Sequence, residues 1–127
     1  MKISIITLFP SMISGFLNES ILKRAQEKKL VEIEVINLRD FAIDDYGTVD
    51  DRPYGGGSGM VLRVDVICKA LLHVIPTRVE GSLPARGGTR DDKQKIILTS
   101  ARGKTYKQSI AQGYSKLDHL IIISGHY

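Results

Sequence analysis

Two short stretches of this sequence carry the small and polar residues that a ligand-binding turn needs. The first, "TSARGKTYKQ" over residues 99–108, follows a predicted strand and leads into a predicted helix. The second, "SGHY" over residues 124–127, follows the next predicted strand. In open parallel sheets, nucleotide-like ligands bind beyond the carboxyl ends of neighbouring strands. Both stretches therefore predict a ligand site, and ordinary strand-to-helix turns are the alternative interpretation.

A third stretch, "PYGGGSGM" over residues 53–60, has four glycines between Tyr54 and Met60. It is neither a Walker loop, because no Gly-Lys-Ser/Thr closes it, nor a dinucleotide fingerprint, because Met60 replaces the third glycine. Glycine permits positive φ and a close approach of the backbone to a ligand or another chain. A flexible surface loop is the alternative. The Pro-Tyr pair before the glycines and the Met-Val-Leu run after them favour a loop held at both ends.

Charged residues stand just ahead of the glycines, where Asp50, Asp51 and Arg52 are adjacent. Two carboxylates could bind a metal ion or accept a proton, but the neighbouring arginine favours salt bridging or turn capping. The three histidines are scattered and match no zinc-ligand spacing. The serines at the ends of two predicted strands lack a Gly-x-Ser-x-Gly elbow. The sequence thus predicts neither a metal centre nor a hydrolase site.

The first elements that must position these residues form a β-α-β unit. Residues 2–8 are Ile-rich, as in a strand buried on both faces. Ser11 is a predicted helix cap, and apolar residues recur at four-residue spacing until about Lys29. Residues 30–38 alternate apolar and acidic side chains, as in a half-exposed strand near a sheet edge. Such a unit favours parallel pairing with a right-handed crossover, and hence an α/β fold.

The rest of the chain predicts a long loop followed by further helices and strands in a single domain. Residues 39–60 lack periodicity, and a helix begins at Val64 and is closed by Pro76. The residues of the predicted apolar stripe of this helix are Val64, Ile67, Cys68, Leu71 and Ile75. Residues 79–94 have the composition of a mobile surface loop. Two buried strands, 95–100 and 119–124, are joined by a helix over about residues 105–116.

Composition sets looser limits. The 127 residues carry a net charge of +4 with a pI near 9.3, which suits a polyanionic partner without requiring one. Cys68 is the single cysteine, so we expect no disulfide, a buried thiol and a reducing compartment. No signal peptide is recognisable, and no apolar run approaches the roughly 18 residues of a membrane span. We therefore expect a soluble cytoplasmic protein.

Five segments in this order, "LFPSM", "RAQEKKLVEI", "NLRDF", "TVDDRPYGGGSGM" and "HLIIISGHY", closely resemble the bacterial tRNA (guanine-N1)-methyltransferases of the SPOUT class. The resemblance implies a cytoplasmic homodimer that methylates N1 of guanine 37 in tRNA when guanine 36 precedes it. It implies S-adenosylmethionine as the methyl donor and a parallel α/β domain with a trefoil knot, an exception to the rule against knots.

The resemblance also assigns site residues. It implies that two strand-end loops bind the cofactor through Leu98, Thr99, Ser100, Ala101, Gly125 and Tyr127. It places the glycine-rich segment near the cofactor at the dimer interface, as part of the wall around a flipped guanine. The residues that we expect to bind the tRNA substrate are Asp50, Arg52, Tyr54, Gly55, Gly56, Gly57 and Gly59.

The family's catalytic aspartate and arginine are expected beyond Tyr127, as is its C-terminal tRNA-binding domain. The resemblance therefore implies a chain truncated before the knot is complete and inactive by itself, with no catalytic base assignable within it. One alternative is a non-catalytic half-domain that binds RNA or S-adenosylmethionine. Another is a SPOUT methyltransferase of ribosomal RNA, which the glycine-rich segment disfavours.

Overall fold

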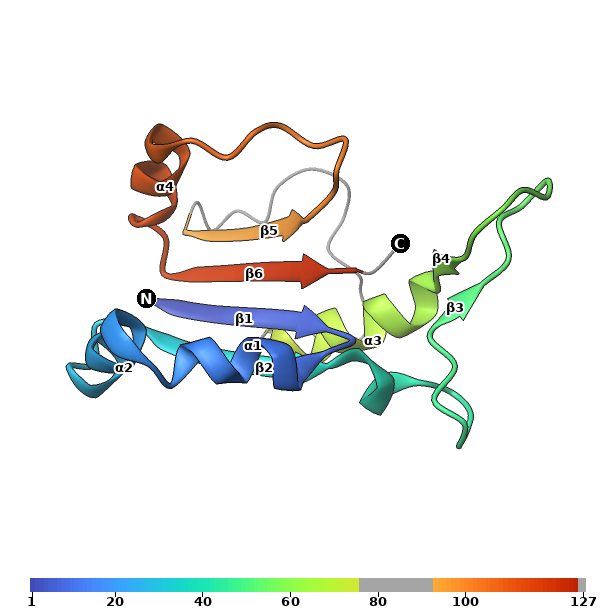
Figure 1. The fold of residues 1–127 in the computed structure, drawn as a ribbon, viewed down its shortest axis with the longest axis horizontal. Coiled ribbons are helices and arrows are strands. Elements are labelled where there is room, and N and C mark those ends of the chain that lie inside the picture. The colour runs from blue at the N-terminus through green and yellow to red at the C-terminus, as the bar shows by residue number, and fades with distance from the viewer. Residues whose placement is uncertain (76–92, 126–127) are drawn as a thin grey trace.

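A computed structural model describes residues 1–75 and 93–125, and the centre of these residues is a parallel sheet (Figure 1). The strand order is β2-β1-β6-β5, and all three pairings are parallel. The bounds of these strands are β1 Lys2–Thr7, β2 Glu32–Asn37, β5 Gln94–Leu98 and β6 His119–Ser124. The β-α-β prediction and the predicted edge position of residues 30–38 are thus confirmed.

Strand β5 corrects the prediction of two equally buried strands at 95–100 and 119–124. Strand β6 lies in the middle of the sheet, and Ile121 in it is fully buried. Strand β5 lies at the edge, and Ile96 and Leu98 leave 43% and 63% of their surface exposed. The reason is packing, because the hydrophobic core draws residues from β1, β2 and β6 but none from β5.

The predicted helix from Ser11 to Lys29 is wrong in its continuity. The structure has two helices, α1 Pro10–Leu17 and α2 Ser20–Glu27, separated at Ser20, whose φ is +49°. Pro10 occupies the first turn of α1 and Phe9 the cap position, so Ser11 is not the cap. Because the break rotates the residues that follow it, Leu17 is buried whereas Ile21, predicted on the same stripe, is 76% exposed.

The helix predicted from Val64 is confirmed as α3 Val64–Val74, but the buried stripe differs. The side chains buried in the core are Val66, Ala70 and Val74, whereas Val64 at the first turn is exposed. Ile67, Leu71 and Ile75 pack beside them and are partly buried. Cys68 is half-buried rather than buried. The apolar face of α3 is broad, and the half that is buried in the core carries Val66, Ala70 and Val74 rather than the predicted residues.

The sheet is covered on both faces, which makes three layers. Helix α3 packs on the face that carries Ile6, Ile36 and Ile121. On the other face, α1 packs against β2, and α4 Gln108–Tyr114 lines a cleft together with β5 and β6. Helix α4 is shorter than the predicted 105–116.

The predicted loop at residues 39–60 contains ordered elements near its ends. A 3-10 helix, η1 Leu38–Phe41, follows β2, and β3 Asp50–Asp51 pairs antiparallel with β4 Val61–Leu62. Of the predicted mobile loop at 79–94, residues 79–92 lie outside the described residues, whereas Gln94 belongs to β5. Pro76, the predicted end of the helix that begins at Val64, also lies outside them. Within the described ranges, no helix is long and apolar enough to cross a bilayer.

Candidate functional site

The first predicted ligand-binding turn is held against the carboxyl end of β6. The backbone N–H and the hydroxyl of Thr99 both donate to the carbonyl oxygen of Ile123, at 3.0 and 3.2 Å. The turn then closes on Ser100, whose carbonyl accepts from the Gly103 N–H at 3.0 Å and whose hydroxyl accepts from the Arg102 N–H at 3.2 Å. The predicted proximity of the two strand-end stretches is thus confirmed.

The second stretch lies against the antiparallel pair formed by β3 and β4. A Cβ atom added to Gly125 would lie 2.8 Å from Leu62 Cδ1, closer than real Cβ contacts allow. Only glycine therefore fits at this position without a shift of Leu62. The contact joins the end of β6 to the strand that follows the glycine-rich segment, about 60 residues earlier in the chain.

The pair β3 and β4 forms a hairpin whose base is anchored in the core. We call Val49–Asp51 and Val61–Arg63 the hairpin base. The Val49 side chain is 2% exposed, and Leu62 packs against the same core cluster. The Arg63 N–H donates to the Val49 carbonyl at 2.8 Å, which extends the two-residue ladder. The prediction of a loop held by the apolar residues after the glycines is confirmed through Leu62.

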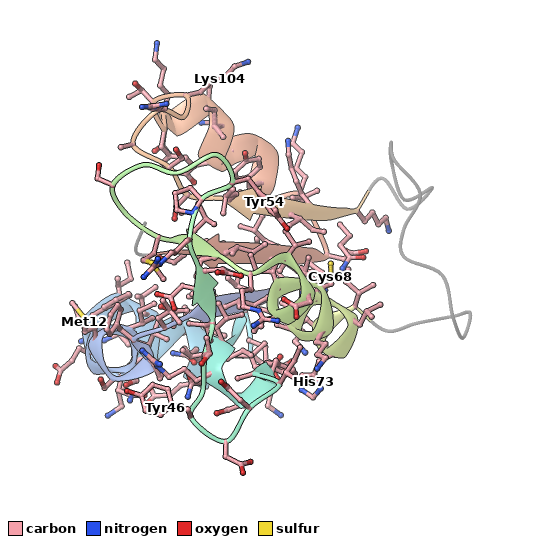
Figure 2. The ribbon with its side chains drawn as sticks, turned by 90° about the vertical axis from the view of Figure 1, so that its right-hand side faces the viewer. Met12, Tyr46, Tyr54, Cys68, His73 and Lys104 are labelled. Carbon is pink, nitrogen blue, oxygen red and sulfur yellow. The ribbon has the colours of Figure 1, made fainter. Side chains whose placement is uncertain are left out.

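The hairpin tip, residues 53–60, extends away from the sheet (Figures 1 and 2). Gly55, Gly56, Gly57 and Gly59 have φ values between +79° and +135°, as the glycine content predicts. A Cβ at Gly55, Gly56 or Gly59 would meet nothing within 4 Å, so these glycines serve backbone conformation within this chain. Tyr54 is fully exposed, so it does not anchor the segment within this chain, whereas Pro53 is half-buried and its carbonyl accepts from the Gly56 N–H at 3.2 Å.

Two charged groups at the hairpin base form interactions that were not predicted. Arg63 and Asp65, at the start of α3, make a bidentate ion pair with a shortest N–O distance of 2.8 Å. The hydrogen bond from Arg63 lowers the pKa of Asp65, and the same bond raises the pKa of Arg63. Among the predicted residues, the Asp51 carboxylate accepts from the backbone N–H of the next residue, Arg52, at 2.7 Å, which is a local contact at the end of β3. The Arg-x-Asp spacing at a helix start was the available signal for the missed pair.

A cleft of about 630 Å³ opens beside the first turn. Its walls are apolar side chains of β5, β6 and α4 together with the hydroxyl-bearing turn. It is lined by four of the predicted cofactor residues, Leu98, Thr99, Ser100 and Ala101. These four residues are exposed to solvent.

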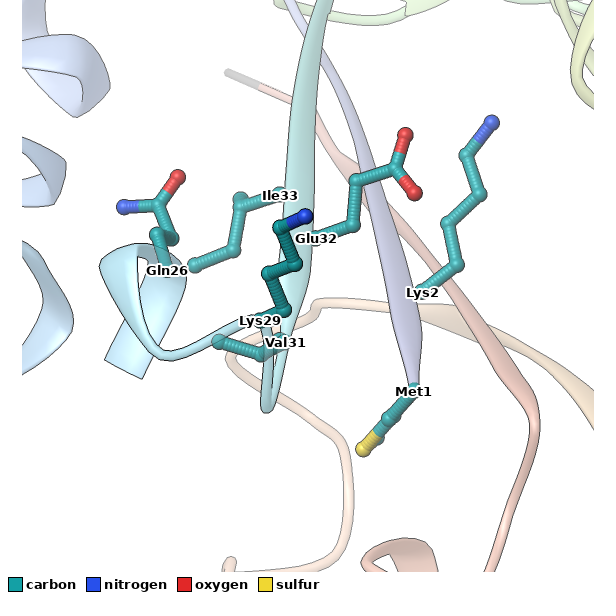
Figure 3. A pocket seen from close by; sticks show the side chains of 7 residues that line it. All are labelled: Met1, Lys2, Gln26, Lys29, Val31, Glu32 and Ile33. Carbon is teal, nitrogen blue, oxygen red and sulfur yellow. The ribbon is translucent and has the colours of Figure 1, made fainter. Parts of the chain in front are cut away.

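A second hollow of about 590 Å³ lies at the opposite end of the sheet, beside the amino ends of β1 and β2 (Figure 3). Its lining residues are Met1, Lys2, Gln26, Lys29, Val31, Glu32 and Ile33. It faces the amino ends of the strands, whereas ligands of open parallel sheets bind at the carboxyl ends. The cleft beside Thr99 is therefore the candidate site.

The structure brings together some of the predicted site residues and separates others. The cleft residues, Gly125 and the hairpin base with Asp50 meet at the carboxyl edge of the sheet. Tyr54 and the four glycines belong to the tip, which joins neither the cleft lining nor the β3–β4 pair. Tyr127 lies outside the described residues. Among the described residues, no group of three or more His, Cys, Asp or Glu side chains gathers in the manner of a metal site.

An open parallel α/β sheet with a cleft beside the carboxyl ends of two adjacent strands is an α/β fold with a hollow where ligands of such sheets bind. The comparisons with known proteins then give the family. The model of the family "tRNA (Guanine-1)-methyltransferase TrmD" matches residues 1–127, and the chain belongs to this family.

Relatives and a solved structure agree with this assignment. The chain is 48% identical over its whole length to the tRNA (guanine-N(1)-)-methyltransferase of Geobacillus kaustophilus and 40% identical to that of Staphylococcus haemolyticus. It spans 47% and 46% of these two proteins, about half of their length. The crystal structure of tRNA (m1G37) methyltransferase from Aquifex aeolicus matches 97% of the chain with a TM-score of 0.78 and 32% identity, over 50% of that chain.

Proposed function

We propose that this protein transfers the methyl group of S-adenosylmethionine to N1 of guanine 37 in tRNA, and that residues 1–127 supply the cofactor turns and part of the substrate wall. The observation that carries the proposal is that three segments meet at the carboxyl ends of the strands: the turn at Thr99, the end of β6 at Gly125, and the hairpin base at Leu62. Membership of a tRNA (guanine-1)-methyltransferase family supports the reaction and the substrate.

The chemistry of the cleft suits S-adenosylmethionine, which would supply an electrophilic sulfonium methyl group when bound. Apolar side chains of Ile97, Leu120 and Ile122 offer a surface for a purine, and the exposed turn offers hydroxyls and backbone groups. The hydrogen bonds of Thr99 and Ser100 hold this turn in one conformation. We propose that Leu98–Ala101, Gly125 and Tyr127 hold the cofactor.

Methylation of N1 also requires the loss of the N1 proton and stabilisation of charge that develops on O6. We assign neither role to a residue of this chain. Asp50 and Arg52, at the hairpin base and just beyond it, are proposed to shape the substrate site, and the tip from Tyr54 to Gly59 to contact the flipped guanine.

The position of the tip supports a homodimer. The tip extends away from the sheet (Figure 1), none of its residues lines the cleft of its own chain, and Tyr54 is fully exposed. In a twofold dimer, the tip of one chain would complete the cleft of the other, which gives the glycine backbone a close approach that it lacks within one chain. Because tRNA is the proposed substrate, we place the protein in the cytoplasm.

The first test measures cofactor binding and methyl transfer separately. Equilibrium dialysis with labelled S-adenosylmethionine reports binding to the 127-residue chain. Transfer of the labelled methyl group is then measured on two tRNA transcripts, one with guanines at positions 36 and 37 and one with adenine at 37. A chain extended to the full length of its relatives is assayed in parallel.

We expect the extended chain to methylate the guanine transcript alone and the 127-residue chain to bind the cofactor without transfer. Transfer to both transcripts, or none by the extended chain, would overturn the proposed reaction. Cofactor binding without any transfer by the extended chain would favour the non-catalytic half-domain.

A further inference from the structure

The positive charge of this chain is concentrated in one part of the structure. Residues 93–125 contain six Lys or Arg and a single Asp, whereas residues 1–75 contain nine Lys or Arg and ten Asp or Glu. The first part therefore has a net charge of +5 and the second of −1. Because the whole chain carries +4, the basic excess belongs to the β5–α4–β6 part and not to the fold in general.

Much of this charge lies on the segment between the candidate cofactor turn and α4. We call Arg102, Lys104, Tyr106 and Lys107 the basic strip. All four residues are exposed, and Lys104 projects from the end of the molecule farthest from Tyr46 (Figure 2). The ion pairs within the described ranges are Lys2–Glu34, Arg63–Asp65 and Lys93–Asp118, so no cation of the strip is paired there. Unpaired exposed cations are available to an anionic partner.

Aromatic rings accompany the cations. The ring of Tyr106 lies 6.2 Å from that of Tyr114 between centroids, with 39° between the planes. Lys95 Nζ lies 5.0 Å from the centroid of the Tyr114 ring, which fixes Tyr114 from the sheet side. Tyr106 is the outer ring and is 65% exposed. An exposed ring between cations is a surface on which a base can stack.

We infer that the basic strip binds the backbone of the tRNA substrate, with Tyr106 stacking on a nucleotide. The identity of the RNA rests on the proposed function, but the surface itself rests on charge, exposure and ring geometry. The strip starts two residues after Ser100, and its Lys104 and Tyr106 also line the rim of the cleft. RNA held there would be positioned relative to the proposed methyl donor by contacts independent of the hairpin tip.

The test compares two triple variants of the 127-residue chain that lose the same charge. The strip variant is Arg102→Ala/Lys104→Ala/Lys107→Ala. The matched control is Lys23→Ala/Arg24→Ala/Lys28→Ala, which removes three exposed cations around α2. Binding of a fluorescent tRNA transcript is followed by anisotropy over a series of salt concentrations, after circular dichroism has shown that each variant is folded.

We expect the strip variant to bind at least about tenfold more weakly at low salt and to reduce the slope of log K against log salt by about two to three. The control should change the slope by less than about one, because it lies outside the binding surface. Equal losses in the two variants would show that binding follows net charge and would overturn the proposal. Absence of tRNA binding by the unmodified chain at low salt would also overturn it, in favour of a different anionic partner.

The aromatic contribution has its own test. Tyr106→Leu should weaken binding by about tenfold without changing the salt slope, because a stacking contact is lost but no charge. Tyr106→Phe keeps the ring and should bind like the unmodified chain. Equal binding by the Leu and Phe variants would refute the stacking role. Equal affinity for the guanine and adenine transcripts would support binding of the strip to the RNA backbone, which both transcripts share. Methylation of both transcripts would refute the proposed reaction but not the role of the strip.

Discussion

The base and the tip of one hairpin differ in almost every physical respect. At the base, Val49 is buried, Leu62 packs on the core, and Gly125 leaves no room for a Cβ beside Leu62. At the tip, Tyr54 is fully exposed and a Cβ on most of the glycines would meet nothing within 4 Å. The base is therefore part of the fold, while the tip is a backbone conformation presented to solvent.

The comparison shows that glycine is required for two different reasons at this site. Gly125 is required because of space, whereas the glycines of the tip are required because of their positive φ. Substitutions at the base should thus change stability, and substitutions at the tip should change function more than stability.

The largest effect is expected for Val49→Ala at the hairpin base. Removal of two buried methyl groups next to Leu38 and Val66 in the same core should lower the free energy of unfolding by about 2 kcal/mol. Urea denaturation followed by circular dichroism measures the change. Tyr54→Ala at the tip is the control and should stay within about 0.5 kcal/mol of the unmodified chain. Similar losses of the free energy of unfolding in both variants would contradict the distinction between a structural base and a functional tip.

A smaller effect is expected for Gly125→Ala, which places a methyl group against Leu62. Overpacking should cost about 1–2 kcal/mol of the free energy of unfolding. In the double variant with Leu62→Ala, the clash is removed, so the two substitutions should be non-additive by at least about 0.5 kcal/mol. A double-mutant cycle from denaturation curves measures this coupling. Strict additivity would mean that Gly125 and Leu62 do not determine each other's packing.

At the tip, Gly57→Val should cost about 1 kcal/mol of stability or less, because a φ of +135° is strained for valine but the open tip can relax. In a chain extended to the length of its relatives, the same substitution should reduce the proposed methyl transfer to the guanine 37 transcript by a much larger factor. Initial rates at saturating cofactor measure the effect. Ser58→Ala, within the same tip, serves as the control, and unchanged transfer by the valine variant would exclude the tip from the substrate site.

The smallest effect is a dependence of stability on pH that arises in the sheet and not in the tip, which contains no Asp, Glu or His. Burial, and then the charge of Lys2, lower the pKa of His119 below 6.5, although Glu34 opposes this shift. His119 Nε2 lies 2.9 Å from the hydroxyl of the fully buried Ser4. Below about pH 6.5 the unfolded chain binds a proton that the folded chain does not, so stability falls as the pH falls through this range.

His119→Gln removes the titrating group and should flatten this dependence. Thermal unfolding midpoints between about pH 7.5 and pH 5.5 compare the variant with the unmodified chain. The free energy of the Val49→Ala variant should keep the same pH dependence as the unmodified chain, since its cavity carries no charge. A dependence that persists unchanged in the His119 variant would assign the titration to another group.

Local patterns in the sequence predicted the elements better than their environments. Alternation in residues 30–38 predicted an edge strand correctly, because the acidic side chains of such a strand need solvent on one face. The apolar run at 95–100 predicts a buried strand, but β5 is an edge strand with Leu98 exposed. Hydrophobicity shows that a residue can be buried, whereas the partner that buries it belongs to another segment of the chain.

Helix registers show the same limit. The apolar spacing did not predict the break at Ser20, where a non-glycine residue has a positive φ and the following residue, Ile21, is exposed. In α3, the apolar face is wide enough for two stripes of residues, and the stripe with Val66 and Ala70 is the one that packs in the core. Such choices depend on shape complementarity between elements, which periodicity does not contain.

Local propensity and motifs were enough to predict the α/β class, the parallel pairing implied by the β-α-β unit, the positive φ of the glycine-rich segment and the resemblance to a methyltransferase family. Tertiary packing was needed to show that Gly125 meets Leu62, that Tyr54 is fully exposed, and that the cations beside Tyr106 form one exposed strip. These contacts join residues far apart in the chain, so they follow from how the layers pack and not from any single stretch of sequence.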